Sequence, residues 1–162
     1  MNSPTGDAQR IGLLLGCLAL PFVAAGIGSL FTSPAIPGWY EALSKPWFTP
    51  PNWVFGPVWT VLYLLQGIAL YLVARTQQAN KGLAIGVFLV QLICNALWPI
   101  VFFGAHQVAW ALIVIVLLLF LIIVTMQVFR GISRLAAWLL LPYALWTSYA
   151  TALNIGILVL NK

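Results

Sequence analysis

Charged side chains are what this chain has least of. Among its 162 residues, 6% are Asp, Glu, Lys or Arg and two are acidic, whereas a typical soluble domain is about 25% charged. Hydrophobic residues make up 63% of the sequence, and the mean hydropathy is +1.05. This composition excludes a water-soluble domain and indicates an integral membrane protein. The length predicts a single domain over residues 1–162.

Histidine and cysteine are also scarce, with one His and two Cys. Cys17 and Cys94 fall in apolar stretches, without a CxxC pair or a second histidine, so we predict no metal site and no disulfide framework. No basic run could follow a phosphate backbone, which argues against a nucleic-acid partner. General acid–base catalysis needs a positioned titratable group. The apolar stretches offer only Tyr and Cys, so we do not predict a classical enzyme.

What the chain does have is long apolar stretches that contain no charged side chain. A helix needs about 20 apolar residues to cross a membrane, and a spanning backbone must satisfy its own hydrogen bonds. We therefore predict an all-α integral membrane protein, a bundle of five transmembrane helices. The spans are about Ile11–Phe31, Trp53–Ala74, Gly82–Gly104, Val108–Phe129 and Leu135–Leu160. Pro21 and Pro142 lie inside two of them and predict kinks.

The few basic residues between these spans predict the orientation of the chain. The N-terminus and the second and fourth connections carry most of them, whereas the opposite side carries Lys45 and Lys162. The positive-inside rule therefore predicts a cytoplasmic N-terminus and a C-terminus outside. The first connection, about residues 32–52, lies outside too. A connection this long in a compact protein is typical of a lid or binding loop.

Tryptophan and proline are concentrated in and after this first connection. The segment 39–63 holds four of the eight tryptophans and four of the ten prolines. Aromatic faces on a backbone stiffened by proline, at the end of a membrane bundle, indicate capture of a flat apolar ligand.

Polar and aromatic side chains recur at helical spacing in three spans. One face of the second span carries Trp59, Tyr63 and Gln66, and the third and fifth spans carry corresponding stripes. The other two stripes are Gln91, Asn95 and Trp98, and Trp146, Ala150 and Asn154. At 1.5 Å per residue, the three stripes line up in layers that begin roughly 9 Å from the outer end. We predict a cavity in the outer half, under the loop, with Asn95 and Tyr63 as its hydrogen-bonding groups.

The same residues have simpler interpretations. Asn and Gln on interior faces also bond neighbouring helices to each other. Tryptophans near span ends form an interfacial belt, which we favour for Trp53 and Trp110. Gly82 and Gly86 have GxxxG spacing, which serves either a contact between two copies or packing within one chain.

The segment WYEALSKPWFTPPNWVFGPVWTVLY (39–63) resembles the signature of the TspO/MBR family. Its members are the translocator proteins, also called tryptophan-rich sensory proteins or peripheral-type benzodiazepine receptors. Two further stretches match, CNALWPIVFFG (94–104) and AWLLLPYALWTSYATALN (137–154). The number of predicted spans and the length agree as well, so the resemblance covers nearly the whole chain.

The resemblance implies a homodimer of five-helix bundles. It also implies a cavity, closed by the first loop, that binds protoporphyrin IX or another haem-like tetrapyrrole and benzodiazepine-type drugs, with no cofactor required. The matching cavity positions are Trp39, Trp59, Tyr63, Asn95, Trp98, Trp146 and Ala150. Trp59 and Trp146 resemble the pair that the family links to light-dependent porphyrin degradation, and they would be catalytic only if that reaction occurs here.

The last span departs from the animal members of the family. Their cholesterol motif needs Leu or Val, then Tyr, then Lys or Arg, whereas this chain reads LNIGILVLNK. We therefore expect a bacterial-type member in a bacterial membrane. The function predicted is tetrapyrrole binding with a sensory or stress-regulatory role. The alternative is facilitated transport of a porphyrin, sterol or lipid, although no Asp, Glu, Lys, Arg or His lies within the spans for ion coupling.

Overall fold

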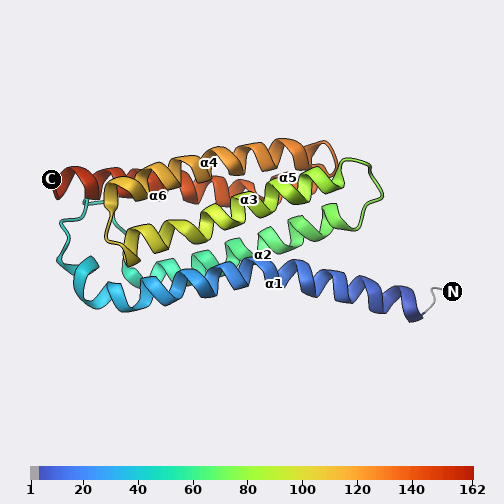
Figure 1. The fold of residues 1–162 in the computed structure, drawn as a ribbon, viewed down its shortest axis with the longest axis horizontal. Coiled ribbons are helices and arrows are strands. Elements are labelled where there is room, and N and C mark those ends of the chain that lie inside the picture. Colours follow the sequence, from blue (N-terminus) through green and yellow to red (C-terminus); the bar gives the residue numbers. More distant parts are fainter. Residues whose placement is uncertain (1–3) are drawn as a thin grey trace.

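The computed structural model describes residues 4–162 and is helical, with no strand in that range (Figure 1). The elements are α1 (Pro4–Ala35), η1 (Ile36–Tyr40), η2 (Asn52–Val54), α2 (Phe55–Ala74), α3 (Lys81–Pro99), η3 (Ile100–Gly104), α4 (Val108–Arg130), α5 (Arg134–Leu139) and α6 (Leu141–Leu160). They form five continuous segments that are long and apolar enough to cross a membrane. The predicted all-α membrane bundle of five spanning helices is confirmed.

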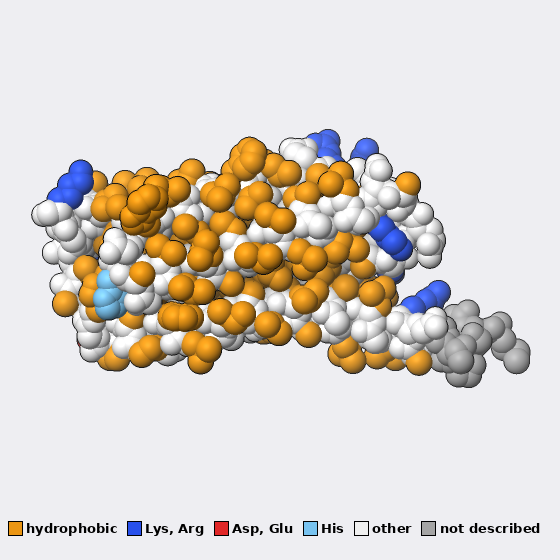
Figure 2. Space-filling view, viewed as in Figure 1, with side chains coloured by type: hydrophobic (Ala, Val, Ile, Leu, Met, Phe, Trp, Pro, Cys, Tyr) orange, Lys and Arg blue, Asp and Glu red, His pale blue; other side chains and the backbone are white. Residues whose placement is uncertain are grey.

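The five segments lie alongside one another, and the two termini lie at opposite ends (Figure 1). Helix α1 packs against α2 and α3, and α4 packs between α3 and α6, while α5 closes the bundle against α2. We call the end with residues 41–51 and the C-terminus the loop end, and the other the N-terminal end. Figure 2 shows hydrophobic side chains covering the flank of the bundle, with Lys and Arg at its two ends. This distribution suits a surrounding hydrocarbon layer.

The N-terminal half of the bundle is filled by a close-packed apolar cluster. Phe88 and Phe129 stack with ring centroids 5.9 Å apart, and neither side chain is exposed. A Cβ placed on Gly67 would lie 2.8 Å from the Leu18 Cα, so the backbones of α1 and α2 touch there. Because lipid is as apolar as these side chains, close packing rather than exclusion of water stabilises such contacts.

The first connection is shorter than the predicted 32–52. The helix continues through Ala35, and the π-helical turn η1 carries it on to Tyr40, so the connection covers only residues 41–51. Pro37 lacks an N–H and has a non-helical ψ of 16°, so the segment kinks at this residue before it reaches Tyr40. Tyr40 is buried against Phe102 and Phe103. This burial holds a segment in helical form that its prolines and glycine alone would have ended.

Pro142 does not kink a continuous helix as predicted. The last span breaks at Leu140, and Pro142 lies in the first turn of α6, where a missing N–H removes no hydrogen bond. The preceding short helix α5 begins with a side-chain cap, since the Ala136 N–H donates to Ser133 Oγ over 3.3 Å. The fifth span is therefore two helices joined at Leu140.

Candidate functional site

A cavity of about 490 Å³ lies in the loop-end half of the bundle. Ligand pockets typically measure about 300–1,000 Å³. Its walls come from α1, α2, the α3–η3 segment and α6, and Tyr40 of η1 also lines it. None of the residues that line it is charged. The cavity therefore offers an apolar interior with hydroxyl, amide and indole groups as its polar contacts.

The structure brings six of the seven predicted site residues together on the walls of this cavity. They are Trp59, Tyr63, Asn95, Trp98, Trp146 and Ala150. They come from α2, α3 and α6, which matches the layered arrangement predicted from the three stripes. Their contact with a ligand stays a prediction.

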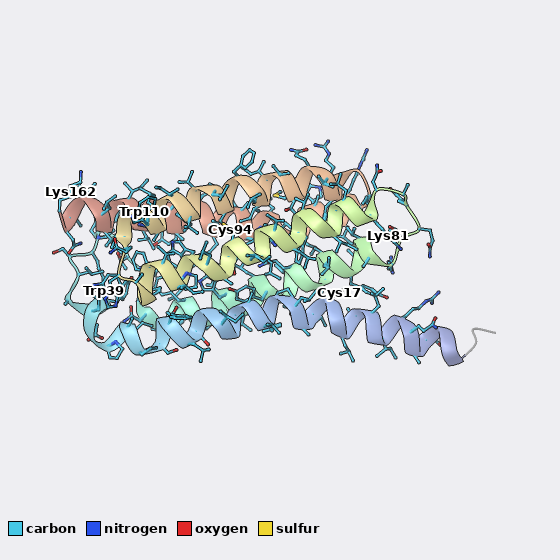
Figure 3. All side chains as sticks on the ribbon, in the orientation of Figure 1. Cys17, Trp39, Lys81, Cys94, Trp110 and Lys162 are labelled. Carbon is cyan, nitrogen blue, oxygen red and sulfur yellow. The ribbon has the colours of Figure 1, made fainter. Side chains whose placement is uncertain are left out.

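Trp39, the seventh predicted residue, lies outside the cavity lining. It belongs to η1 rather than to a loop, and its ring stacks on His106 with centroids 4.3 Å apart and planes at 12°. Its ring also packs edge-to-face with that of Phe102, with centroids 5.5 Å apart. Figure 3 shows Trp39 at the loop end of the bundle. Trp39 thus supports the cavity wall from behind, and its neighbour Tyr40 lines the cavity instead.

A continuous chain of side-chain hydrogen bonds begins at the cavity and runs deeper into the bundle. Tyr63 Oη donates to Asn95 Oδ1 over 2.9 Å, and Asn95 Nδ2 donates to Tyr143 Oη over 2.9 Å. Tyr143 Oη then donates to Gln91 Oε1 over 3.1 Å, and Gln91 Nε2 donates to Gln66 Oε1 over 3.3 Å. Since an unsatisfied polar group inside a membrane costs several kcal/mol, this chain ties α2, α3 and α6 together. Asn95 is already bonded through both its oxygen and its nitrogen.

Tyr143 is the member of this chain that the stripes did not identify. It lies one turn before Thr147 on α6, with 1% of its side chain exposed. The spacing i, i+4 from Tyr143 to Thr147 was the available signal. From the sequence alone, Tyr143 could equally have been a packing residue or a hydrogen-bonding residue.

Trp98 has its indole N–H occupied. Its Nε1 donates to Asn154 Oδ1 over 3.2 Å, and Asn154 Nδ2 donates to the Val108 carbonyl over 2.9 Å. The Trp98 ring stacks on Phe102 at 5.1 Å with planes at 26°. Trp98 therefore offers a fixed aromatic face to the cavity rather than a free donor.

Trp59 and Trp146 differ from Trp98 in their surroundings. The Trp59 ring stacks on Tyr63 at 5.4 Å with planes at 26°. Trp146 meets Phe55 edge-on at 5.9 Å, and its Nε1 is buried without a hydrogen-bond partner. A buried donor left unpaired costs about 1–3 kcal/mol. Trp146 therefore carries a buried N–H that has no hydrogen-bond partner among the described residues.

The connection 41–51 is fastened to the end of α6. The Ser44 N–H donates to Asn161 Oδ1 over 2.9 Å, and Asn161 Nδ2 donates to the Ser44 carbonyl over 2.8 Å. Tyr149 Oη donates to the Phe48 carbonyl over 2.6 Å. Pro46 packs on the backbone of Gly156, where a Cβ would lie 2.8 Å from the Pro46 ring. The connection is thus held down on the loop end of the bundle at several points.

Sequence reasoning missed the wall that α1 contributes. Its lining residues are Phe22, Ala25, Gly28, Ser29, Thr32 and Ser33. They are mostly small, so they carry neither the aromatic nor the amide signal of the other stripes. The hydroxyls of Ser29 and Thr32 in an otherwise apolar span were the one available sign.

Gly82 and Gly86 lie on an exposed face of α3. Among the described residues, and apart from adjacent residues and the backbone of α3 itself, no heavy atom lies within 4 Å of a Cβ placed at either position. Packing within the chain therefore does not explain their spacing, and this face is free to meet a second copy.

The fold and the site together define a multi-pass membrane protein with an uncharged, aromatic-walled cavity at one end. The family model described as "TspO/MBR family" matches residues 17–160. The chain belongs to the TspO/MBR family. It is 40% identical over 153 residues to the tryptophan-rich protein TspO of Archaeoglobus fulgidus, covering 94% of this chain and 97% of the relative.

Two further relatives have names that describe a role. The tryptophan-rich sensory protein of Cereibacter sphaeroides is 38% identical over 147 residues, covering 89% of this chain and 91% of its own. The translocator protein of Homo sapiens is 38% identical over 145 residues, covering 86% and 85%. Family membership thus gives this integral membrane protein a role of the sensory or transport type.

Proposed function

We propose that the protein binds tetrapyrroles such as protoporphyrin IX, and related flat hydrophobic molecules, in the loop-end cavity, and that binding serves a sensory or stress-regulatory role. The observation that carries this proposal is the cavity itself, whose walls are aromatic and carry no charged residue. A flat conjugated ring gains dispersion and stacking energy on such walls. The tryptophan-rich sensory relative supports the regulatory part of the proposal.

Two aromatic pairs on the cavity walls are available to stack on a planar ligand. The Trp59–Tyr63 stack comes from α2, and the Trp98–Phe102 stack comes from α3 and η3. The buried Nε1 of Trp146 has no partner, and a small rotation of the indole would be needed to present it to a ligand acceptor. The ring would therefore be held by stacking, with one directional bond to fix its orientation.

The absence of charge in the lining bears on how a porphyrin would sit. Its carboxylates would have to stay outside the cavity, because no cation lines the walls. Lys45 lies behind Tyr40, with its Nζ 4.8 Å from the ring centroid and donating to the Glu41 and Leu43 carbonyls. The carboxylates would point toward the headgroup layer.

Protoporphyrin IX titration with tryptophan fluorescence as the readout tests the binding proposal. We expect the double variant Trp59→Ala, Trp146→Ala to lose at least about tenfold in affinity, which equals about 1.4 kcal/mol. The matched control is Trp110→Ala, Trp138→Ala, which removes the same number of tryptophans from exposed positions outside the lining. Equal affinity of the two double variants would reject the cavity as the site.

Light-dependent degradation is a separate proposal about the same residues. Trp59 and Trp146 line the cavity and would lie beside a bound ring that absorbs light. We expect illuminated protoporphyrin to lose absorbance faster in the presence of the protein than with the Trp59→Phe, Trp146→Phe variant. A dark sample and empty detergent micelles are the controls. Equal loss in empty micelles would show that the protein does not catalyse the reaction.

Facilitated transport is the alternative function, and the translocator name of the human relative favours it. The apolar cluster around Phe88 and Phe129 fills the N-terminal half of the bundle, which gives a through-path less support than binding. Porphyrin uptake into proteoliposomes, compared with empty vesicles, would decide between them.

Orientation and assembly complete the proposal. We place the N-terminus in the cytoplasm of a bacterial cell, since most of the basic residues gather at the N-terminal end. We also propose a homodimer that uses the exposed face of Gly82 and Gly86.

A further inference from the structure

How a ligand reaches the cavity depends on where its lining residues meet the surface of the molecule. Tyr40 forms part of the wall there and is only 5% exposed. The connection 41–51 above it is tied to α6 through Ser44, Phe48 and Pro46. A route from water beneath this connection would require several hydrogen bonds to break together. Asn52 and Trp53, which follow the connection, line the cavity and are exposed.

Helix α1 changes neighbour along its length. Near its middle it touches α2, where Gly67 leaves room for Leu18 and Cys17. Toward the loop end it leans on the other side, on the α3–η3 segment. There Gly28 lies against Pro99, and Gly104 lies against Phe31, with added Cβ atoms 2.9 and 2.7 Å from those side chains. The close backbone contact at Gly67 therefore does not extend to the loop-end parts of α1 and α2.

Residues on both sides of this α1–α2 boundary line the cavity and are also exposed on the molecule. They are Ser29 and Ser33 of α1, and Gly56 and Thr60 of α2. Thr60 lies five residues into α2, about 8 Å along the helix. Thr60 therefore lies within the part of α2 that would cross the hydrocarbon layer, which is about 30 Å thick. The cavity thus reaches the surface at membrane depth.

The hydroxyl groups at this boundary suit an opening toward lipid. Ser29 Oγ donates to the Gly26 carbonyl over 2.8 Å, and Thr60 Oγ1 donates to the Gly56 carbonyl over 2.9 Å. Each hydroxyl proton is thus bonded within its own helix, so it demands no partner from lipid or ligand. An apolar molecule passing between α1 and α2 would leave these two donors satisfied.

We propose that ligands reach the cavity sideways from the outer half of the bilayer, through a window between α1 and α2 lined by Ser29, Ser33, Gly56 and Thr60. This inference rests on the proposed function, because it concerns the same cavity and its apolar ligand. A flat hydrophobic molecule concentrates in the bilayer, so a window there meets it where it is most abundant. The fastened connection 41–51 then serves as a fixed cover rather than a door.

A cleavable cross-link across the window tests the route. In a full-length Cys17→Ala, Cys94→Ala background, Ser29→Cys and Thr60→Cys are joined by a disulfide-containing bismaleimide, and the protein is reconstituted in vesicles. The matched control joins Val61→Cys and Leu145→Cys across the apolar groove between α2 and α6, which lies outside the window. Stopped-flow quenching of tryptophan fluorescence by protoporphyrin IX gives the association and dissociation rates.

We expect the window cross-link to slow association and dissociation by the same factor, at least about tenfold, because a route affects both directions equally and leaves the dissociation constant unchanged. Reduction of the linker restores both rates in the same sample, and the control cross-link leaves them unaltered. Unchanged rates with the window joined would overturn the inference. So would faster exchange in Asn161→Ala, which releases the cover.

Failure of the proposed function would look different. If the protein without any cross-link does not quench with protoporphyrin IX, binding itself is absent and the route falls with it. If that protein binds and the window cross-link has no effect on the rates, the binding proposal stands and only the route is wrong.

Discussion

The two halves of this bundle use the same helices for different purposes. The N-terminal half is filled by apolar side chains such as Phe88 and Phe129. The loop-end half contains a cavity of about 490 Å³ with aromatic walls. The hydrogen-bonded chain from Tyr63 to Gln66 lies between them. The difference shows that a membrane bundle can leave one half open when the other half, and the polar chain, hold the helices in place.

Among the changes proposed here, disrupting the contact between α1 and α2 in the filled half is expected to lower stability most. Gly67→Val places a side chain against the backbone of Leu18 and Cys17, and overpacking of this kind costs about 3 kcal/mol at the upper end. We expect a clear drop of the thermal midpoint in detergent. Gly26→Val is the matched control, because no heavy atom lies within 4 Å of its added Cβ. Equal midpoints would show that the close contact between α1 and α2 does not stabilise the bundle.

Breaking the hydrogen-bonded chain between the two halves is expected to have the next largest effect on stability. Asn95→Ala leaves Tyr63 without its acceptor and Tyr143 without its donor, and buried groups left unpaired cost about 2 kcal/mol. We expect a lower thermal midpoint and weaker protoporphyrin binding. Adding Tyr63→Phe removes the orphaned donor, so the double variant should lose less than the sum of the two single changes. Strict additivity would mean that the chain does not couple α2 to α3.

The fastening of the cover gives a smaller effect. Asn161→Ala removes both hydrogen bonds to Ser44, which contribute about 1 kcal/mol net. We expect faster hydrogen exchange in residues 41–51, while the exchange of α4 stays as it is. Lys162→Ala is the control at the neighbouring position. An unchanged exchange rate in 41–51 would show that Tyr149 and Pro46 hold the cover alone.

The exposed glycine face is expected to leave a single copy almost unaffected. A Cβ added at Gly86 meets no heavy atom of a neighbouring helix within 4 Å, so we expect Gly86→Leu to leave the thermal midpoint of the monomer nearly unchanged. If the proposed dimer uses this face, the variant elutes as a monomer in detergent, because a larger side chain prevents close approach. Gly12→Leu, also free of neighbours, is the control. A dimer that survives Gly86→Leu would place the interface elsewhere.

Hydropathy and helical spacing in the sequence were sufficient to determine the solvent, the number of spans and three of the cavity walls. Six of the seven predicted site residues line the cavity. Local physics explains this success, since a helix in lipid must bond its own backbone and direct its polar residues inward. Residues at i, i+4 on one helix share a face whatever surrounds them.

Only the tertiary structure decided the remaining features. It extended the first helix through Pro37 to Tyr40, turned Trp39 away from the cavity, and began α6 after a break at Leu140. It also supplied Tyr143 as the partner of Asn95 and α1 as the fourth wall. Each of these depends on which distant side chain fills the neighbouring space. The tryptophan-rich segment 39–63, read alone, could not show which of its rings would face the cavity.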